Sequence, residues 1–477
     1  MSDLQSTVPL ASSDGATLSG SLPMSVDIGL MRRRVFDLAW PVIGENFLQT
    51  MLGIVDTLLV AQLGTAAIAG VGAALQLMFF VIAVLSAVSV GSAVLVAQAI
   101  GGRDHQRASV LARQSLVWSV IISIPLAAAG LFAAEQLIGI FGMEPDVTAI
   151  GADYLRVVMG TVVMLSLMLL SSGVLRGAGD SRTPMLITLI ANMINVVLTY
   201  GLIFGRWGMP ELGVVGSAWG TFLSRTVGFI LLFIVLWRGQ RGISTRGRNG
   251  WLPDWSVARG ILRIGVPAAV EQVLVTTGFF LMTLVVAHLG TVALAAHRIA
   301  MNAMSLSFLP GFGFGLAATT LVGQSIGARR PDEGAAAGAI ATRWGLVWMS
   351  ALGVIFFFAA EPIIRLFSDD SAVIGMGTSA LRTIALVQPF WAVSFIQAGA
   401  LRGTGNTQYP LRVNTSGIWV AVLLGGLFSY FIPNSLSAVW SAFILTAPIT
   451  AYLHWRKFRR STAQPPLLKS AHVLEAS

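Results

Sequence analysis

Apolar runs long enough to cross a lipid bilayer recur along the whole chain, and they constrain its fold more than any other feature. Two examples are residues 68–96 and 213–237. About 20 apolar residues in a helix span the hydrocarbon core of a membrane. Only 11% of the 477 residues are charged, against about 25% in a soluble domain. The sequence therefore predicts an all-α polytopic protein of the cell's inner membrane, with the lipid bilayer as its solvent.

Twelve membrane helices are expected from the apolar runs. Their expected ranges are 38–63, 66–98, 110–134, 148–173, 184–205, 213–237, 262–289, 293–323, 336–360, 374–399, 410–432 and 437–455. Basic residues gather in alternate gaps between these ranges, and cytoplasmic loops hold the Lys and Arg excess. We therefore expect both termini in the cytoplasm. The same pattern accounts for the net charge of +9 without nucleic-acid binding.

One phrase is written twice, as GVLRGAGDSRTPM at 173–185 and GALRGTGNTQYPL at 399–411, 226 residues apart. Pro41 and Pro267 keep the same offset, which indicates a duplicated six-helix unit. Six is an even number, so both copies enter the membrane from the same side and form parallel repeats, as in transporters that bind substrate between two halves. The phrase itself is interpreted as a turn, because its glycines suit the end of a helix and its proline the start of the next.

The duplication divides the chain into five expected segments. They are a disordered cytoplasmic tail at 1–34, an N-lobe at 35–237, a basic cytoplasmic linker at 238–261, a C-lobe at 262–456 and a second tail at 457–477. The first tail lacks the pattern of a cleaved signal peptide. No cysteine is present, which excludes disulfides, thiolate metal sites and cysteine nucleophiles.

Several stretches together resemble one known family. They are PVIGENFLQTMLGIVDTLLVAQLG, VAQAIGGRD, LGTVALAAHRIAMN, FLPGFGFGLAATTLVGQSIGARR and the two Leu-Arg-Gly phrases. As a set they resemble the MATE (multidrug and toxic compound extrusion) family of cation-coupled antiporters over residues 36–455. The resemblance implies a V-shaped pair of six-helix lobes that export organic cations in exchange for protons or sodium ions.

Ionisable residues within a bilayer are costly and are candidates for function. Glu45 and Asp56 are 11 residues apart, so on a helix they share one face with Gln49 and stand about 16 Å apart along its axis. Asp56 matches the acid of the family's GIVDT stretch, which the resemblance makes a cation-coupling residue. Its repeat partner is Met282, so the lobes differ chemically at that depth.

Glu45 and Glu271 form a symmetric pair, each four residues after a proline, Pro41 or Pro267, that we expect to kink its helix. With Asn46 and Gln272 they are candidates for two similar cavity walls. The alternative interpretation is a glutamate that holds its own lobe together. Some relatives carry a further acid where Val275 or Trp391 stands here, which shifts the expected coupling site to the N-lobe.

Asn192, Asn195 and Thr199 lie on about one face of the fifth expected helix. They could complete an ion site with Asp56, or they could join helices by hydrogen bonds. Some relatives have an acid where Thr199 stands. Arg225 lies within the sixth helix, where snorkelling towards the cytoplasm is favoured over pairing with an acid.

A metal site and a cofactor are not expected, because His288 and His297 are not accompanied by clustered ligands. A buried carboxylate that binds either a proton, a sodium ion or an organic cation would couple ion entry to substrate exit. The proton is favoured over sodium because Asp56 has few oxygen neighbours to form a sodium cage. The partners are then small amphipathic, mostly cationic substrates, and the chain is expected to act as a monomer.

Two other functions fit the sequence less well. A lipid-linked saccharide flippase of the same superfamily would handle an anionic pyrophosphate, so several cavity arginines would be expected. An integral membrane enzyme would need a nucleophile, metal ligands or paired catalytic acids, and the sequence offers no such constellation. In this sequence the buried charges are mainly acids and the expected helix count is twelve, which opposes the flippase, and a channel or receptor is opposed by the tandem duplication with a buried acid in each half.

Overall fold

Helices account for all the regular structure in the computed structural model, which describes residues 27–463. One isolated β-bridge joins Gln240 and Ile243 in the linker between the two halves. The outer parts of both predicted tails, 1–26 and 464–477, lie outside the described residues. The first half contains α1 (Ile28–Ala61), α2 (Thr65–Gly101), α3 (His105–Phe132), α4 (Ala134–Gly139), α5 (Pro145–Gly160), α6 (Val162–Gly177), α7 (Arg182–Phe204) and α8 (Gly213–Arg238).

The second half repeats this order with nearly the same bounds shifted by 226 residues. Its helices are α9 (Trp255–Ala287), α10 (Thr291–Gly327), α11 (Pro331–Phe358), α12 (Ala360–Arg365), α13 (Ser371–Ala385), α14 (Gln388–Gly403), α15 (Gln408–Phe431) and α16 (Leu436–Ala463). The pairs α2 and α10, α3 and α11, α4 and α12, and α6 and α14 match this shift at both ends. The predicted all-α fold of two repeated lobes is therefore confirmed.

Within residues 27–463, nine helices are long and apolar enough to cross a membrane, and two bent helix pairs raise the number to eleven. The predicted number of twelve would also require α1. This helix has 34 residues, but its Glu45, Asn46, Gln49 and Asp56 lower its mean hydropathy.

Two of the expected helices are broken. The range expected at 148–173 is the pair α5 and α6, bent by 50°, and the range expected at 374–399 is the pair α13 and α14, bent by 52°. In the second pair the break precedes Pro389, which has no amide hydrogen to continue the helical bonding. In the first pair it falls at Gly160 and Thr161, whose hydroxyl donates to the Val157 carbonyl at 2.8 Å.

Three helices extend furthest beyond their expected ends. Residues 28–34, expected in a disordered tail, form the first turns of α1, and Asp27 caps them by accepting a hydrogen bond from the Leu30 amide at 3.0 Å. The linker shortens because α9 begins at Trp255, where Asp254 accepts from the Ser256 amide at 2.8 Å. The α16 helix continues to Ala463. These extensions are more polar than the apolar cores, so hydropathy underestimated their length.

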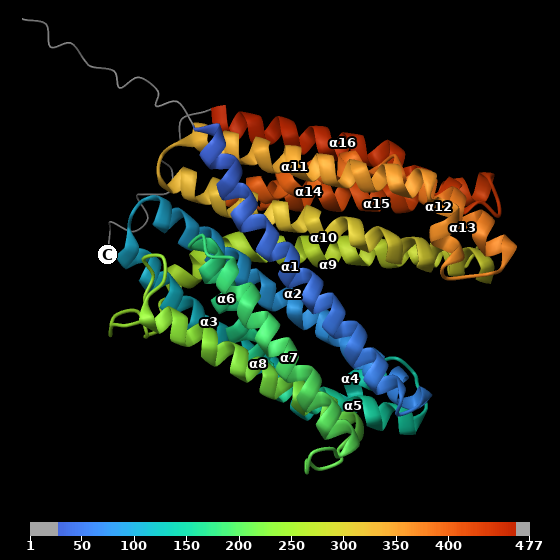
Figure 1. Ribbon diagram of the computed structural model, residues 1–477, viewed down its shortest axis with the longest axis horizontal. Coiled ribbons are helices and arrows are strands. Elements are labelled where there is room, and N and C mark those ends of the chain that lie inside the picture. The colour runs from blue at the N-terminus through green and yellow to red at the C-terminus, as the bar shows by residue number, and fades with distance from the viewer. Residues whose placement is uncertain (1–26, 464–477) are drawn as a thin grey trace, which may run out of the picture.

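The α1 helix crosses from one lobe to the other, running diagonally between the two bundles in Figure 1. Its first turns belong to the core of the C-lobe, where Val35 and Ala39 are buried with Phe314 and Ile340. The start of α9 makes the corresponding crossing, and Ile261 is buried with Val88 and Leu170 of the N-lobe. The lobes are therefore joined through the first helix of each repeat.

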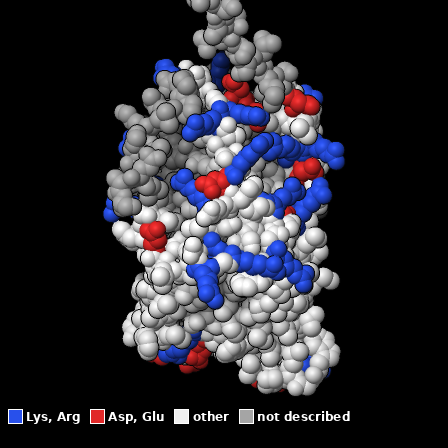
Figure 2. Space-filling view, turned by 90° about the vertical axis from the view of Figure 1, so that its left-hand side faces the viewer, with Lys and Arg blue, Asp and Glu red and all other residues white. Residues whose placement is uncertain are grey.

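The two bundles come together at the end that holds the start of α1 and diverge towards the other end (Figure 1). Figure 2 looks onto the converging end and shows Lys and Arg side chains gathered across it. A cavity of about 1250 Å³ opens there, and its walls include Arg103, Arg107, Arg329 and Arg330. Asp104, Asp254 and Glu333 also line this cavity, and none of the predicted site residues does.

Candidate functional site

Glu45 is held at the centre of a three-helix contact in the N-lobe. It lies on α1 and is only 4% exposed. Its Oε2 accepts a hydrogen bond from Arg176 Nη1 on α6 at 2.9 Å, and its Oε1 accepts from Thr188 Oγ1 on α7 at 3.5 Å. A buried carboxylate is stable when it is paired and hydrogen-bonded. Glu45 therefore ties α1 to α6 and α7.

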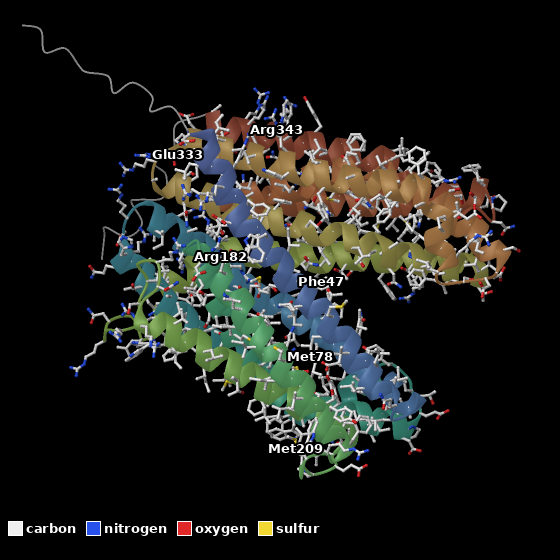
Figure 3. All side chains as sticks on the ribbon, in the orientation of Figure 1. Phe47, Met78, Arg182, Met209, Glu333 and Arg343 are labelled. Atoms are coloured by element: carbon white, nitrogen blue, oxygen red, sulfur yellow. The ribbon has the colours of Figure 1, made fainter. Side chains whose placement is uncertain are left out.

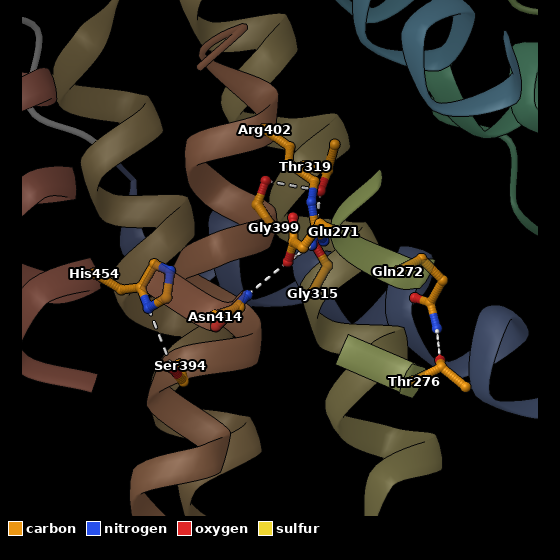
Figure 4. A network of polar contacts seen from close by, with 10 residues as sticks. All are labelled: Glu271, Gln272, Thr276, Gly315, Thr319, Ser394, Gly399, Arg402, Asn414 and His454. Atoms are coloured by element: carbon orange, nitrogen blue, oxygen red, sulfur yellow. Dashed lines mark hydrogen bonds and ion pairs between the residues drawn. The ribbon is translucent and has the colours of Figure 1, made fainter. Parts of the chain in front are cut away.

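Glu271 makes the equivalent contact in the C-lobe (Figure 4). Its Oε1 accepts from Arg402 Nη2 on α14 at 2.7 Å and from Asn414 Nδ2 on α15 at 2.6 Å. Its second oxygen, Oε2, is buried without a hydrogen-bond partner, and so is Nε of Arg402. The C-lobe pair is thus only partly satisfied within the protein.

The arginine of each Leu-Arg-Gly phrase is therefore the partner of the symmetric glutamate, a role that the sequence interpretation missed. In the pattern of basic gaps, Arg176 and Arg402 count only among the Lys and Arg residues that indicate the cytoplasmic side. Both ion pairs join residues 131 positions apart. The signal that could have indicated them was this equal separation of an acid and a base in both repeats.

Asp56 has different surroundings, in the half of α1 that lies towards the diverging end. Its Oδ1 is buried without a hydrogen-bond partner. Arg225 on α8 attracts it electrostatically, and Tyr154 on α5 lies close enough to interact with both charges. No nitrogen of Arg225 is within 4.0 Å of a carboxylate oxygen among the described residues. This electrostatic attraction favours the alternative interpretation, in which Arg225 compensates an acid, over snorkelling towards the cytoplasm.

Asn195 and Thr199, predicted with Asp56 as an ion site, are bonded to one another and to α8. Asn195 Nδ2 donates to Thr221 Oγ1 and to Ser224 Oγ, each at 3.2 Å, and Asn195 Oδ1 accepts from Thr199 Oγ1 at 3.4 Å. The structure does not bring either residue into a hydrogen bond with Asp56. Their geometry corresponds to the second alternative, hydrogen bonds between helices.

The other predicted cavity residues are dispersed. Asn192 Nδ2 donates to the Leu48 carbonyl at 2.9 Å and so joins α7 to α1. Asn46 is half-buried, and Gln49 and Gln272 are exposed. Gln272 Nε2 donates to Thr276 Oγ1 at 3.4 Å, along its own helix (Figure 4).

Pro41 and Pro267 lie inside α1 and α9, each of which continues through its proline as a single helix. Each proline therefore does not end its helix, and the kinks expected at Pro41 and Pro267 stay predictions. On the same helix as Pro41 and Glu45, the exposed ring of Phe47 stands where the bundles begin to separate (Figure 3). The α1 face between the lobes thus combines apolar and polar side chains.

The C-lobe has no copy of the Asp56 cluster. Met282 takes the place of Asp56 and is 1% exposed. Gly425 takes the place of Thr199, and a Cβ there would lie 3.1 Å from the Met282 sulfur. The sequence-based expectation that the lobes differ at this depth agrees with this apolar packing.

The two histidines singled out in the sequence are apart from any acid cluster. His297 Nδ1 accepts from Trp440 Nε1 at 3.1 Å, and its Nε2 is 3.2 Å from Thr283 Oγ1. His288 is exposed, with Nδ1 2.8 Å from the Leu284 carbonyl. Across the part of the chain that the structure describes, no group of three or more His, Asp or Glu is placed to hold a metal ion.

Comparisons with known proteins agree with the repeat. A sequence model of the MatE family matches residues 41–201 and again residues 267–427. The chain is 36% identical over 397 residues to the "Probable multidrug resistance protein NorM" of Thermotoga maritima, covering 82% of this chain and 84% of that protein. It is 30% identical over 393 residues to the "Multidrug resistance protein NorM" of Burkholderia vietnamiensis, covering 80% of this chain and 83% of that protein.

Solved structures share the fold at lower identity. A crystal structure described as MATE in the bent conformation superposes with a TM-score of 0.84 at 23% identity, covering 91% of this chain and 97% of that one. A transporter of the MOP superfamily from Pyrococcus furiosus superposes with a TM-score of 0.82 at 23% identity, with the same coverage. At this identity the likeness establishes the fold.

Proposed function

The chain belongs to the MatE family, and from that premise we propose that it is a multidrug efflux antiporter. Its relatives are named multidrug transporters, so a transporter, and not an enzyme, is the function class. In our proposal it exports small amphipathic, mostly cationic compounds across the inner membrane in exchange for protons. A sodium-coupled form of the same cycle is the variant to be tested against it.

The observation that carries the proposal is the Asp56 carboxylate. One of its oxygens is buried without a hydrogen-bond partner, and a buried charge without a full set of partners is costly. A cation at this oxygen would offset that cost. Because a proton and an organic cation compete for one negative charge, entry of the first can drive exit of the second.

The hydrogen bonds of Asn195 and Thr199 support the proton over sodium. Sodium needs several oxygen ligands around it, but the Asn195 amide is bonded to α8 and the Thr199 hydroxyl is bonded to Asn195. A proton needs only one oxygen.

The arrangement of the lobes supports alternating access. Basic residues gather at the converging end (Figure 2), which the positive-inside tendency places in the cytoplasm. Both termini would then be cytoplasmic, and this conformation would be closed on the inside. One chain contains both lobes, so we propose that a monomer is sufficient for transport.

The test is ion-driven uptake of a fluorescent organic cation into inside-out vesicles, with a proton gradient and a sodium gradient imposed separately. We expect uptake with the proton gradient alone. Uptake with sodium alone would replace the proton in the proposal. Vesicles that accumulate no cation under either gradient, but translocate an anionic lipid-linked saccharide, would overturn it in favour of a flippase.

The contacts of the buried arginines argue against that flippase. Arg176 and Arg402 are each paired with a glutamate, at 2.9 and 2.7 Å, and Arg225 is attracted electrostatically by Asp56. The two paired arginines are therefore not available for a pyrophosphate.

A further inference from the structure

Two symmetric hydrogen bonds join the lobes at the converging end. Gln98 Nε2 on α2 donates to the Gly403 carbonyl of the C-lobe at 3.1 Å, and Gln324 Nε2 on α10 donates to the Gly177 carbonyl of the N-lobe at 3.1 Å. We call these four residues the glutamine–glycine latch. Each acceptor is the glycine of a Leu-Arg-Gly phrase, and each donor belongs to the opposite lobe.

The backbones of α2 and α10 touch beside the latch. A Cβ at Gly101 would lie 1.8 Å from the Gln324 carbonyl oxygen, and a Cβ at Gly327 would lie 1.8 Å from that of Gln98. No side chain fits at either glycine. The latch therefore stands where the backbones of the two lobes are in direct contact, and it cannot persist if the lobes separate at this end.

Each latch carbonyl follows directly after an arginine that binds a buried glutamate. Arg176 precedes Gly177 and binds Glu45, and Arg402 precedes Gly403 and binds Glu271. The Arg176 carbonyl also accepts from Thr320 Oγ1 of the opposite lobe at 3.2 Å. The guanidinium of each arginine thus contacts an acid within its own lobe, while the backbone beside it contacts the other lobe.

We propose that Arg176 and Arg402 are positioning residues that couple the charge of Glu45 and Glu271 to the closure of the converging end. A cation that neutralises the glutamate weakens its hold on the arginine. The Arg-Gly turn then shifts, the glutamine of the opposite lobe loses its acceptor, and the lobes separate. This inference rests on the proposed alternating-access function and adds a residue-level connection between the acids and the lobe contact.

Incomplete pairing in the C-lobe supports this role. Oε2 of Glu271 and Nε of Arg402 are both buried without hydrogen-bond partners, so the carboxylate keeps an acceptor oxygen that a proton or another cation could satisfy. Around Glu271 the charged and polar groups are Arg402 on α14 and Asn414 on α15, and His454 on α16 lies within electrostatic reach of Arg402. Around Glu45 they are Arg176 on α6 and Thr188 on α7.

The test measures the distance between the lobes at the converging end. Gln106 and Asp332 are exposed repeat partners at the starts of α3 and α11, and the chain has no native cysteine. Cysteines introduced at both positions carry spin labels. Double electron–electron resonance in nanodiscs then measures the distance between the two labels, and the distance distribution gives the fractions of closed and separated molecules. This readout responds to lobe separation and not to a loss of folded protein.

In the proposal each glutamate is linked through its arginine to one of the two latch bonds, so a double-mutant cycle can detect the link. Glu45→Gln mimics the neutralised acid, and Gln324→Ala removes the latch donor that serves the same arginine. We expect each to raise the ratio of separated to closed molecules about fivefold, the worth of one net hydrogen bond. Together they should also give about fivefold, and not the product of about 25-fold expected for independent sites.

The matched control combines a glutamate and a glutamine that belong to different latch bonds. Glu271→Gln acts on the other latch bond, between Gly403 and Gln98, so combined with Gln324→Ala it should reach about 25-fold. Arg176→Gln should behave like Glu45→Gln, and Arg176→Lys, which keeps the charge, should give a smaller change. If an arginine variant does not fold, the glutamate and glutamine cycle alone decides.

Two cations test the neutralisation step in the parent protein. Acidic pH, and tetraphenylphosphonium at neutral pH, should each raise the separated fraction, and Glu45→Gln combined with Glu271→Gln should remove that response. Equal, fully additive effects in both cycles would overturn the inference even if cation transport is present. Conversely, if the Glu45 and Gln324 substitutions are non-additive but the protein transports no cation, the proposed function is overturned and this inference is not.

Discussion

Asp56 and Glu45 share one helix but differ in what surrounds them. Glu45 is bonded to Arg176 at 2.9 Å, whereas Asp56 keeps a buried oxygen without a partner and has Arg225 only at longer range. Truncation of an acid that holds helices together should mainly affect stability. Removal of the charge of an acid that binds the coupling ion should mainly affect transport.

We predict that Asp56→Asn leaves the protein abundant and monodisperse but removes most gradient-driven efflux. Asn keeps the shape and the hydrogen-bonding capacity of Asp but cannot carry the charge that a cation neutralises. Efflux at matched expression is the measurement, and Met282→Leu at the repeat-related position is the control that should transport normally. If the Asn variant transports as well as the parent, the coupling role belongs elsewhere, first to Glu45.

We predict the opposite pattern for Asn195→Ala. Thr221 and Ser224 would each lose a buried hydrogen-bond donor, which costs about 1–3 kcal/mol for each unsatisfied group. The midpoint of thermal unfolding in detergent should fall, with transport per folded molecule largely kept. Loss of transport without loss of stability would instead return Asn195 to the ion site.

At the scale of helices, close backbone contacts fix how the repeats cross. A Cβ at Gly265 on α9 would lie 1.7 Å from the Ala87 carbonyl oxygen on α2, and a Cβ at Gly91 would lie 2.1 Å from that of Ile261. The first helix of the C-lobe can therefore pack in this way on the N-lobe only with glycine at these positions. The broken helices α5–α6 and α13–α14 add equivalent bends in both lobes.

We predict that Gly265→Ala destabilises the protein by about 1–3 kcal/mol, the usual cost of forcing extra atoms into a packed contact. The matched control is Gly72→Ala on α2, where a Cβ would meet nothing within 4 Å. Alanine favours the helix over glycine by about 1 kcal/mol, so the control should be neutral or stabilising. The measurement is the midpoint of thermal unfolding of both variants and the parent in one detergent. A stable Gly265→Ala protein would show that α2 and α9 can separate at no cost.

For the whole molecule, the asymmetry of charge sets the orientation. In the proposed orientation, the basic residues at the converging end, such as Arg103 and Arg329 on the wall of the cavity, lie in the cytoplasm, as the positive-inside tendency predicts. The lobes would then be closed inside and would diverge outwards. Orientation and conformation together define the direction in which the next substrate can leave.

We predict that a membrane-impermeant thiol reagent labels Asp369→Cys in intact cells and does not label Gln106→Cys. Both positions are exposed in the structure, and Asp369 belongs to an acidic loop at the diverging end, whereas Gln106 lies at the converging end. Both should react after the cells are permeabilised, which is the control for reactivity. The reverse pattern in intact cells would invert the proposed orientation.

Much of this architecture follows from the sequence itself. Apolar runs of bilayer length, a register of 226 residues held from Pro41 to Pro184, and few buried acids are properties of local sequence and of its repetition. They were sufficient to predict an all-α membrane protein of two parallel lobes and to separate Asp56 from Met282. Helix ends were less predictable, because the polar first turns of α1 and α9 have no apolar signal.

The partners of the side chains were decided only by the tertiary structure. Arg176 reaches Glu45 across 131 positions, Asn195 turns to α8 and not to Asp56, and Gln98 meets Gly403 across 305 positions. Such contacts depend on how each helix is rotated and where it crosses its neighbours. Side-chain packing sets both, and hydropathy and spacing along one chain do not record them.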